Sequence, residues 1–131
     1  MYIRRGDDSV LSVMTHNYEY VGGAHGGRYY TAYNIDVQTG KEILLEDVIV
    51  DKSRLAQALA TELEEKYWDY EMTENYWLEI LNNYVTTEPL EYKPEFTWTV
   101  EYDGVTFYFG NYELGAYAMG TQEVTLHYSE Y

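Results

Sequence analysis

The sequence predicts an α+β domain in which helices pack on one face of an antiparallel sheet, and three observations support this fold class. Segments toward both ends of the chain alternate apolar and polar residues, which is typical of strands with one buried face. The middle of the chain repeats apolar residues every three or four positions, as helices do. Because the strands precede and follow the helices instead of alternating with them, an antiparallel sheet is favoured over a parallel one.

The length of 131 residues suits a single domain spanning 1–131, because domains of ~100–150 residues are the commonest. Residues 1–9 show no clear pattern, and we expect a poorly ordered lead-in there. No apolar stretch approaches the ~18 residues of a membrane helix, and the first residues lack the apolar run of a signal peptide. We therefore expect no membrane insertion by this part of a protein.

The first strands are predicted at 10–20 and 28–37, where apolar and polar residues alternate. The segment Gly22-Gly23-Ala24-His25-Gly26-Gly27 separates them and places four glycines in six positions. Glycine adopts the backbone angles of tight turns at little cost, so this segment reads as a shaped turn between two strands. A second turn at 38–41 and a short strand at 42–45 complete the predicted meander.

Two helices are predicted in the middle of the chain. Leu55, Leu59 and Leu63 recur every four residues and predict a longer helix docked on the sheet, with Asp51 or Ser53 as its N-cap. A shorter helix is predicted at 73–84. Prolines at positions 89 and 94 end the helical region, because the residue before a proline is disfavoured in a helix.

The last strands are predicted at 95–102, 105–109 and 123–128. Asp103-Gly104 separates the first two, and this pair is typical of a two-residue hairpin turn. The segment 110–120 remains as a loop. The sheet is therefore expected to combine the meander with a C-terminal hairpin.

Charge narrows the possible partners of the chain. It carries 23 Asp and Glu against 8 Lys and Arg, a net charge of −15. Such a surface repels phosphate backbones and anionic membranes, so nucleic acid is excluded as a partner. It attracts a cationic protein, and the alternative is that acidity only keeps the domain in solution.

Tyrosine is the second compositional signal, with 17 Tyr and 3 Trp beside only 3 Phe. One small core cannot absorb so many rings with polar tips, so part of the set must lie on the surface. Exposed tyrosines favour contacts with protein or sugar. The alternative is that they cover faces of the sheet, where tyrosine has good propensity.

Catalytic and metal-binding patterns are weak in this sequence. Absence of cysteine removes thiolate sites, and His16, His25 and His127 are too far apart to form a recognisable metal motif. His25 has no nucleophile at motif spacing, and a structural turn is the simpler reading of its glycine-rich surroundings. Paired carboxylates occur by chance among so many acids. We therefore predict no catalytic residue, no cofactor and no metal.

The loop at 110–120 is the best candidate binding segment from the residues alone. It places Tyr112, Leu114, Tyr117 and Met119 between glycines. Aromatic and apolar side chains on a loop fit an interface better than a core. The alternative is that Tyr112 and Tyr117 fold back and cap the sheet.

Two separated motifs resemble the RsiV-like C-terminal domain family. The first motif is the stretch Gly22, Gly23, Ala24, His25 and Gly26 followed by Asn34, Asp36 and Gly40. The second is Asp103 and Gly104 followed by the segment from Tyr112 to Gly120. The motifs occur in the family's order and the resemblance covers the chain from about Ser12 to Tyr128, which makes it fairly specific.

The resemblance implies an extracytoplasmic domain of membrane-anchored or secreted proteins, mainly from Gram-positive bacteria. One family member is an anti-sigma factor that binds lysozyme, and others accompany a polysaccharide deacetylase whose catalytic residues lie in another domain. We therefore expect a non-catalytic recognition domain for a cationic protein such as lysozyme. The alternative is an accessory domain that binds peptidoglycan or another cell-wall glycan.

The resemblance also implies where the ligand docks. The docking loop would comprise Tyr112, Glu113, Leu114, Gly115, Ala116 and Tyr117. Family members often have prolines near the start of this loop and inside it, whereas this chain has Asn111 and Gly115-Ala116. The loop is therefore less rigid and would lose more entropy on ordering.

Overall fold

A computed structural model of the chain defines the fold. The structure describes residues 1–19, 27–49, 51–52, 54–68, 72–86, 94–110, 113–114 and 120–127. Within this part of the chain, no helix is long and apolar enough to cross a membrane.

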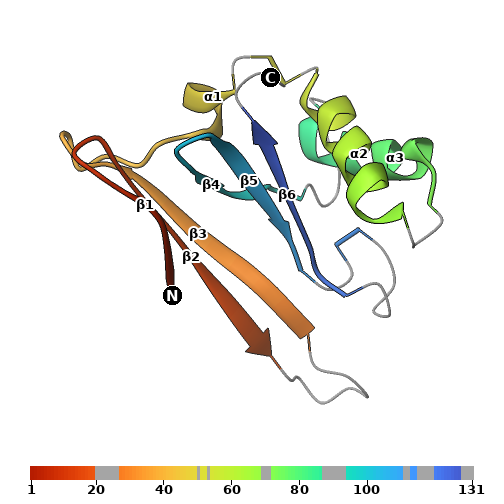
Figure 1. Cartoon of the computed structure of the whole chain (residues 1–131), viewed down its shortest axis with the longest axis horizontal. Coiled ribbons are helices and arrows are strands. Elements are labelled where there is room, and N and C mark those ends of the chain that lie inside the picture. Colours follow the sequence, from red (N-terminus) through yellow and green to blue (C-terminus); the bar gives the residue numbers. More distant parts are fainter. Residues whose placement is uncertain are drawn as a thin grey trace.

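Six strands and three helices follow one another along the chain. They are β1 (Tyr2–Gly6), β2 (Val10–Glu19), β3 (Gly27–Asp36), α1 (Leu45–Val48), α2 (Leu55–Lys66), α3 (Glu74–Val85), β4 (Thr97–Val100), β5 (Gly104–Phe109) and β6 (Gln122–His127). The strands form two antiparallel sheets, ordered β1-β2-β3 and β4-β5-β6. Figure 1 shows the second sheet between the first sheet and the helices α2 and α3. The predicted α+β class is confirmed, and its sheet is divided into two.

The two predicted helices are confirmed as α2 and α3, whereas α1 was not predicted. In α2, Leu55, Leu59 and Leu63 are fully buried, as their four-residue spacing predicts. Its N-cap is Arg54 with no side-chain capping bond, so Asp51 does not cap it, and Ser53 lies outside the described residues. For α3 the cap is Thr73, whose hydroxyl accepts a hydrogen bond from the Tyr76 N–H.

The expectation of a poorly ordered lead-in at residues 1–9 is wrong, because β1 pairs with β2 along the edge of the first sheet. The connection is closed by Asp7, whose Oδ1 accepts the N–H groups of Ser9 and Val10, each at 2.8 Å. Those hydrogen bonds, with that of Val10 the largest cause and an additional one from Arg5, lower the pKa of Asp7 to about 2.

The short strand predicted at 42–45 is also wrong. A single bridge joins Glu42 to Ile35, and the chain then turns into α1 at Leu45. The turn is favoured because Asp47 Oδ2 accepts the Leu44 N–H at 3.0 Å, which satisfies a backbone donor at the start of the helix.

The hairpin between β4 and β5 is confirmed, but its turn is displaced by one residue. Glu101 N–H donates to the Gly104 carbonyl at 2.8 Å, so Tyr102 and Asp103 occupy the turn. Gly104 is the first residue of β5 and lies opposite His127. A Cβ there would stand 2.1 Å from the Leu126 carbonyl oxygen. Glycine is thus required for close approach of β6.

The apolar core lies between the second sheet and the helices. Alternate residues of β5 and β6 face α2 and α3, whose leucines meet them. The buried members on the strands are Trp98, Val100, Val105, Phe107, Phe109, Val124 and Leu126.

The opposite face of the second sheet is polar, and it meets the first sheet. Its buried residues on β4 and β5 are Thr99, Thr106 and Tyr108. Thr99 Oγ1 and Tyr108 Oη are 2.9 Å apart, and Thr106 pairs with Thr125 across β5 and β6 at 2.7 Å. The hydrogen bonds that join this face to the first sheet come from Asn34, whose amide donates to the Trp98 carbonyl, and from Ser12, whose hydroxyl accepts the Val100 N–H.

Candidate functional site

The predicted docking loop is only partly within the described residues, which include Glu113 and Leu114 but not Tyr112 or the segment 115–117. Leu114 is 1% exposed and belongs to the apolar core. Its carbonyl accepts the hydroxyl of Tyr76 at 2.9 Å. The expectation that Leu114 contacts a ligand is therefore corrected: this residue ties the loop to α3.

Glu113 lies beside Leu114 and has an exposed side chain. Its carboxylate accepts the N–H of Gly110. Partial desolvation nevertheless raises the pKa of Glu113 above its ordinary value, against the opposing effect of that hydrogen bond. Glu113 is the one predicted docking residue that the described part of the chain offers to a partner.

The first predicted motif also lies only partly within the described residues. Gly22, Gly23, Ala24, His25 and Gly26 lie outside the described residues. Asp36 and Gly40 build the turn after β3: the Gly40 N–H donates to the Asp36 carbonyl at 2.7 Å. Asp36 Oδ1 accepts the Gln38 N–H at 2.9 Å, and Gly40 has a φ of 73° that favours glycine.

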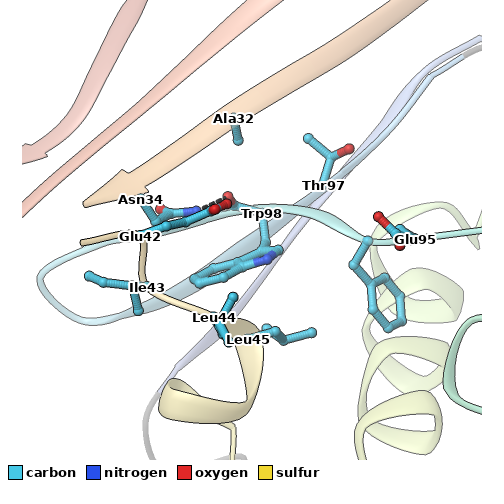
Figure 2. A pocket seen from close by; sticks show the side chains of 10 residues that line it. Ala32, Asn34, Glu42, Ile43, Leu44, Leu45, Glu95, Thr97 and Trp98 are labelled. Atoms are coloured by element: carbon cyan, nitrogen blue, oxygen red, sulfur yellow. Dashed lines mark hydrogen bonds between the residues drawn. The ribbon is translucent and has the colours of Figure 1, made fainter. Parts of the chain in front are cut away.

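Asn34 has a specific structural role between the sheets. Its Nδ2 donates to the Trp98 carbonyl at 2.8 Å, while its Oδ1 accepts the Val100 N–H at 3.3 Å (Figure 2 shows the Trp98 bond). Ser12 Oγ also accepts the Val100 N–H, at 2.9 Å. The side chain of Asn34, which is 5% exposed, thus pairs with β4 as a neighbouring backbone would.

Two adjoining cavities lie where β4 begins, next to Asn34. Their volumes are about 250 and 340 Å³. Both are lined by Leu44, Leu45, Glu95, Phe96 and Trp98, and we call this shared hollow the Trp98 groove. One cavity extends it toward Glu42 and the other toward Tyr84.

Aromatic side chains form the wall of the Trp98 groove. Trp98 is 9% exposed, and Phe96 stacks on Tyr84 with ring centroids 4.7 Å apart. Figure 2 shows the nitrogen-bearing edge of the Trp98 indole turned toward the side on which Glu95 lies. Among the described residues, none accepts a hydrogen bond from the Trp98 indole N–H.

Carboxylates line the Trp98 groove and its extension: Glu95 lines both cavities, and Glu42 lines one of them. Glu42 and Glu95 are exposed, and within the described part of the chain neither has a cationic partner. The lysine in the lining, Lys52, is engaged by Glu46 at 2.7 Å. The groove therefore combines apolar walls with negative charge, which suits a cation on an apolar stem.

A second surface lies on the outer face of the first sheet. Cross-strand neighbours place Ile3, Val13 and Tyr33 in one row and Asn17 and Tyr29 in another. Ile3 is 68% exposed and Tyr33 58%. Residues that face outward here are uncharged wherever the structure describes them: Ile3, Leu11, Val13, Thr15, Asn17, Tyr29, Thr31, Tyr33 and Ile35.

The two described histidines lie away from the groove. His16 stacks on Tyr30 with ring centroids 4.5 Å apart, and His127 Nδ1 lies 3.5 Å from Asp103 Oδ2. Across the described ranges, no three His, Cys, Asp or Glu side chains gather as a metal site would require.

Sequence analysis missed the Trp98 groove. Its lining comes from the segments around positions 44 and 96, which no motif connects. The available signal was the pair of apolar residues Leu44 and Leu45 beside Glu42 and Glu46, next to a predicted turn. That pattern alone reads as a short strand.

Comparison with known proteins identifies a matching family and solved structures with a similar fold. The family model described as "Protein of unknown function (DUF3298)" matches residues 46–129. A solved DUF3298-family protein from Bacteroides fragilis is 24% identical, with a TM-score of 0.65, and the match covers 98% of this chain and 49% of that one. A DUF3298-family protein from Pseudomonas aeruginosa is 21% identical, with a TM-score of 0.59, over 98% and 56% of the two chains.

The chain thus spans about half the length of these solved relatives. At this level of identity the likeness concerns the fold alone. No curated protein matches the chain significantly.

Proposed function

The chain belongs to the DUF3298 family, and from that premise we propose that it is a non-catalytic recognition domain for a cationic protein outside the cell. Within the family, the RsiV-like motifs of the sequence make lysozyme the first partner to test. The same motifs support an extracytoplasmic location, as part of a membrane-anchored parent protein. No chemistry of its own is assigned to the domain.

One observation carries this proposal: the net charge of −15 coincides with an open aromatic groove whose exposed carboxylates lack cationic partners in the described part of the chain. Unpaired surface charge steers an oppositely charged protein and raises its association rate. Aromatic walls then supply contact area that charge alone lacks. The docking loop around Glu113 would add a second contact.

Titration calorimetry against hen-type lysozyme, at low and at physiological salt, tests the proposal. We expect saturable one-to-one binding whose affinity falls as salt rises, because salt screens exposed charges. Tyr117→Ala should abolish binding, whereas Tyr18→Ala, which removes an exposed ring at the end of β2, should not. Absence of heat at both salt concentrations would reject lysozyme as the partner, and equal binding by an unrelated basic protein would reject specificity.

A second candidate function rests on the outer face of the first sheet. An uncharged surface with exposed Tyr29 and Tyr33 beside threonine and asparagine offers rings for stacking and polar groups for hydroxyls. This favours an accessory domain that binds cell-wall glycan. Retention on insoluble peptidoglycan that is lost in the Tyr29→Ala/Tyr33→Ala double variant, without affinity for lysozyme, would support this alternative.

A further inference from the structure

We propose that the Trp98 groove receives one lysine or arginine side chain of a cationic protein, with the peptide carbonyl of that residue accepting the Trp98 indole N–H. The inference rests on the proposed function and specifies where and how the partner is held. Three features of the groove carry it.

The first feature is the indole N–H of Trp98. Trp98 is more than nine-tenths buried and lines both cavities of the groove. An indole N–H can only donate, and that of Trp98 is not among the buried unpartnered atoms of the described residues, so it is open to solvent. Because no described residue accepts it either, the donor can be taken by a ligand that enters the groove. A ligand that docks here therefore needs an acceptor such as a backbone carbonyl.

The second feature is the apolar lining between this donor and the mouth of the groove. Phe96 and Leu45 are partly buried, and Leu44 is 54% exposed. Lysine and arginine side chains lay their methylene groups along such surfaces while the charged end stays near water. A cation close to an aromatic face gains further attraction from the ring. The lining thus fits the stem of a basic side chain.

The third feature is the charge at the mouth. Glu42 and Glu95 extend from opposite segments of the lining, one before α1 and one before β4. The nearby Lys52 is already paired with Glu46, so within the described residues no cation compensates the carboxylates of Glu42 and Glu95. An anionic ligand would be repelled, and a neutral sugar would leave this charge unneutralised. A basic side chain satisfies all three features at once.

Nuclear magnetic resonance on the ¹⁵N-labelled full chain can test this at the atom concerned. The chain has three tryptophans, and Trp98→Phe identifies the indole signal of Trp98 by its loss. The probe is the blocked tripeptide acetyl-Gly-Lys-Gly-amide, with acetyl-Gly-Gln-Gly-amide as the neutral match. We expect the lysine peptide to shift the Trp98 indole signal saturably and the glutamine peptide to leave it unchanged.

Matched variants assign the effect to the two carboxylates. The double variant Glu42→Gln/Glu95→Gln should lower the affinity for the lysine peptide about tenfold. One exposed ion pair contributes little, but both carboxylates attract the same cation. Asp8→Asn/Glu79→Gln removes the same charge from exposed positions elsewhere and should leave the peptide affinity unchanged. An equal loss in both double variants would show general electrostatics and overturn the proposal. A shift by neutral N-acetylglucosamine oligomers but not by the lysine peptide would overturn it in favour of a sugar site.

Lysozyme titrations of the same variants separate this inference from the proposed function. If lysozyme binds the wild type and Glu42→Gln/Glu95→Gln equally, the groove assignment fails and the recognition function stands. If lysozyme does not bind but the peptide shifts Trp98 as expected, the groove assignment stands and lysozyme is rejected as the partner.

Discussion

The two faces of the second sheet are held by different forces. Toward the helices, Val105, Phe107 and Phe109 of β5 enter an apolar core. Toward the first sheet, Thr106 and Tyr108 of the same strand enter a hydrogen-bonded layer. A single strand with alternating side chains thus takes part in an apolar interface on one face and in an interface rich in hydrogen bonds on the other.

This difference shows that the contacts that hold a layer in place need not be the contacts that align it. Apolar burial stabilises in proportion to area and has little directional preference, so the helices can adjust as they pack. Hydrogen bonds require particular atoms at particular angles. The bonds of Asn34 to Trp98 and Val100 therefore fix where the first sheet lies against β4.

The largest expected effect is in the apolar layer. Phe107→Ala should destabilise the fold by about 3–5 kcal/mol, because it removes a fully buried ring and leaves a cavity. Urea denaturation followed by circular dichroism measures the change. Tyr33→Ala, which truncates an exposed ring on the first sheet, is the control and should change stability by less than about 1 kcal/mol. A similar loss in both variants would contradict the contrast between the layers.

An intermediate effect is expected in the polar layer. Asn34→Ala leaves the Trp98 carbonyl without its partner and removes one of two acceptors from the Val100 N–H, at a cost of about 2 kcal/mol. The same denaturation measurement applies, with Asn75→Ala on the exposed side of α3 as the matched control. If Asn34→Ala were neutral, the first sheet would not depend on this side chain for its alignment.

The smallest effect should appear only at alkaline pH. Burial raises the pKa of Tyr108 from 10 to about 12, against a hydrogen bond with Thr99 that lowers it. Because the folded state holds this proton more tightly than the unfolded state, the contribution is intact below pH 10 and is lost as pH rises toward about 12.

Denaturation at intervals across that range, in the wild type and in Tyr108→Phe, measures the contribution. The variant should lose less stability with rising pH than the wild type. Tyr102→Phe changes a tyrosine whose side chain is exposed, and it should follow the wild-type profile. If stability depends on pH in the same way in Tyr108→Phe and in the wild type, Tyr108 does not contribute to the loss of stability at alkaline pH.

Sequence patterns predicted the elements better than their assembly. The spacing of Leu55, Leu59 and Leu63 identifies α2 because a helix with one buried face repeats in that way. Alternation locates β2 and β3 for the same kind of reason. The division into two sheets was not predicted, because Ser12, Asn34 and Thr99 are polar and read as solvent-facing. Their burial depends on partners far away in the sequence.

The candidate site was less predictable than the fold. Leu114 reads as an exposed loop residue because it lies among glycines, yet it packs into the core below α3. Glu42 and Glu95 are 53 positions apart and become neighbours of one groove only after β3 and β4 meet. The pattern of side chains along the sequence shows only local periodicity, whereas this groove forms between segments that are far apart in the sequence.

The pairing of Asn34 with β4 also bears on how the protein behaves at high concentration. An unpaired strand edge is a template on which another chain can add a strand, and repeated addition leads to fibrils. A side-chain amide occupies the outer edge of β4 at Trp98 and Val100 but offers no further backbone for the next strand. Asn34 therefore occupies part of that edge, so the residue that aligns the two sheets also opposes the addition of a further strand there.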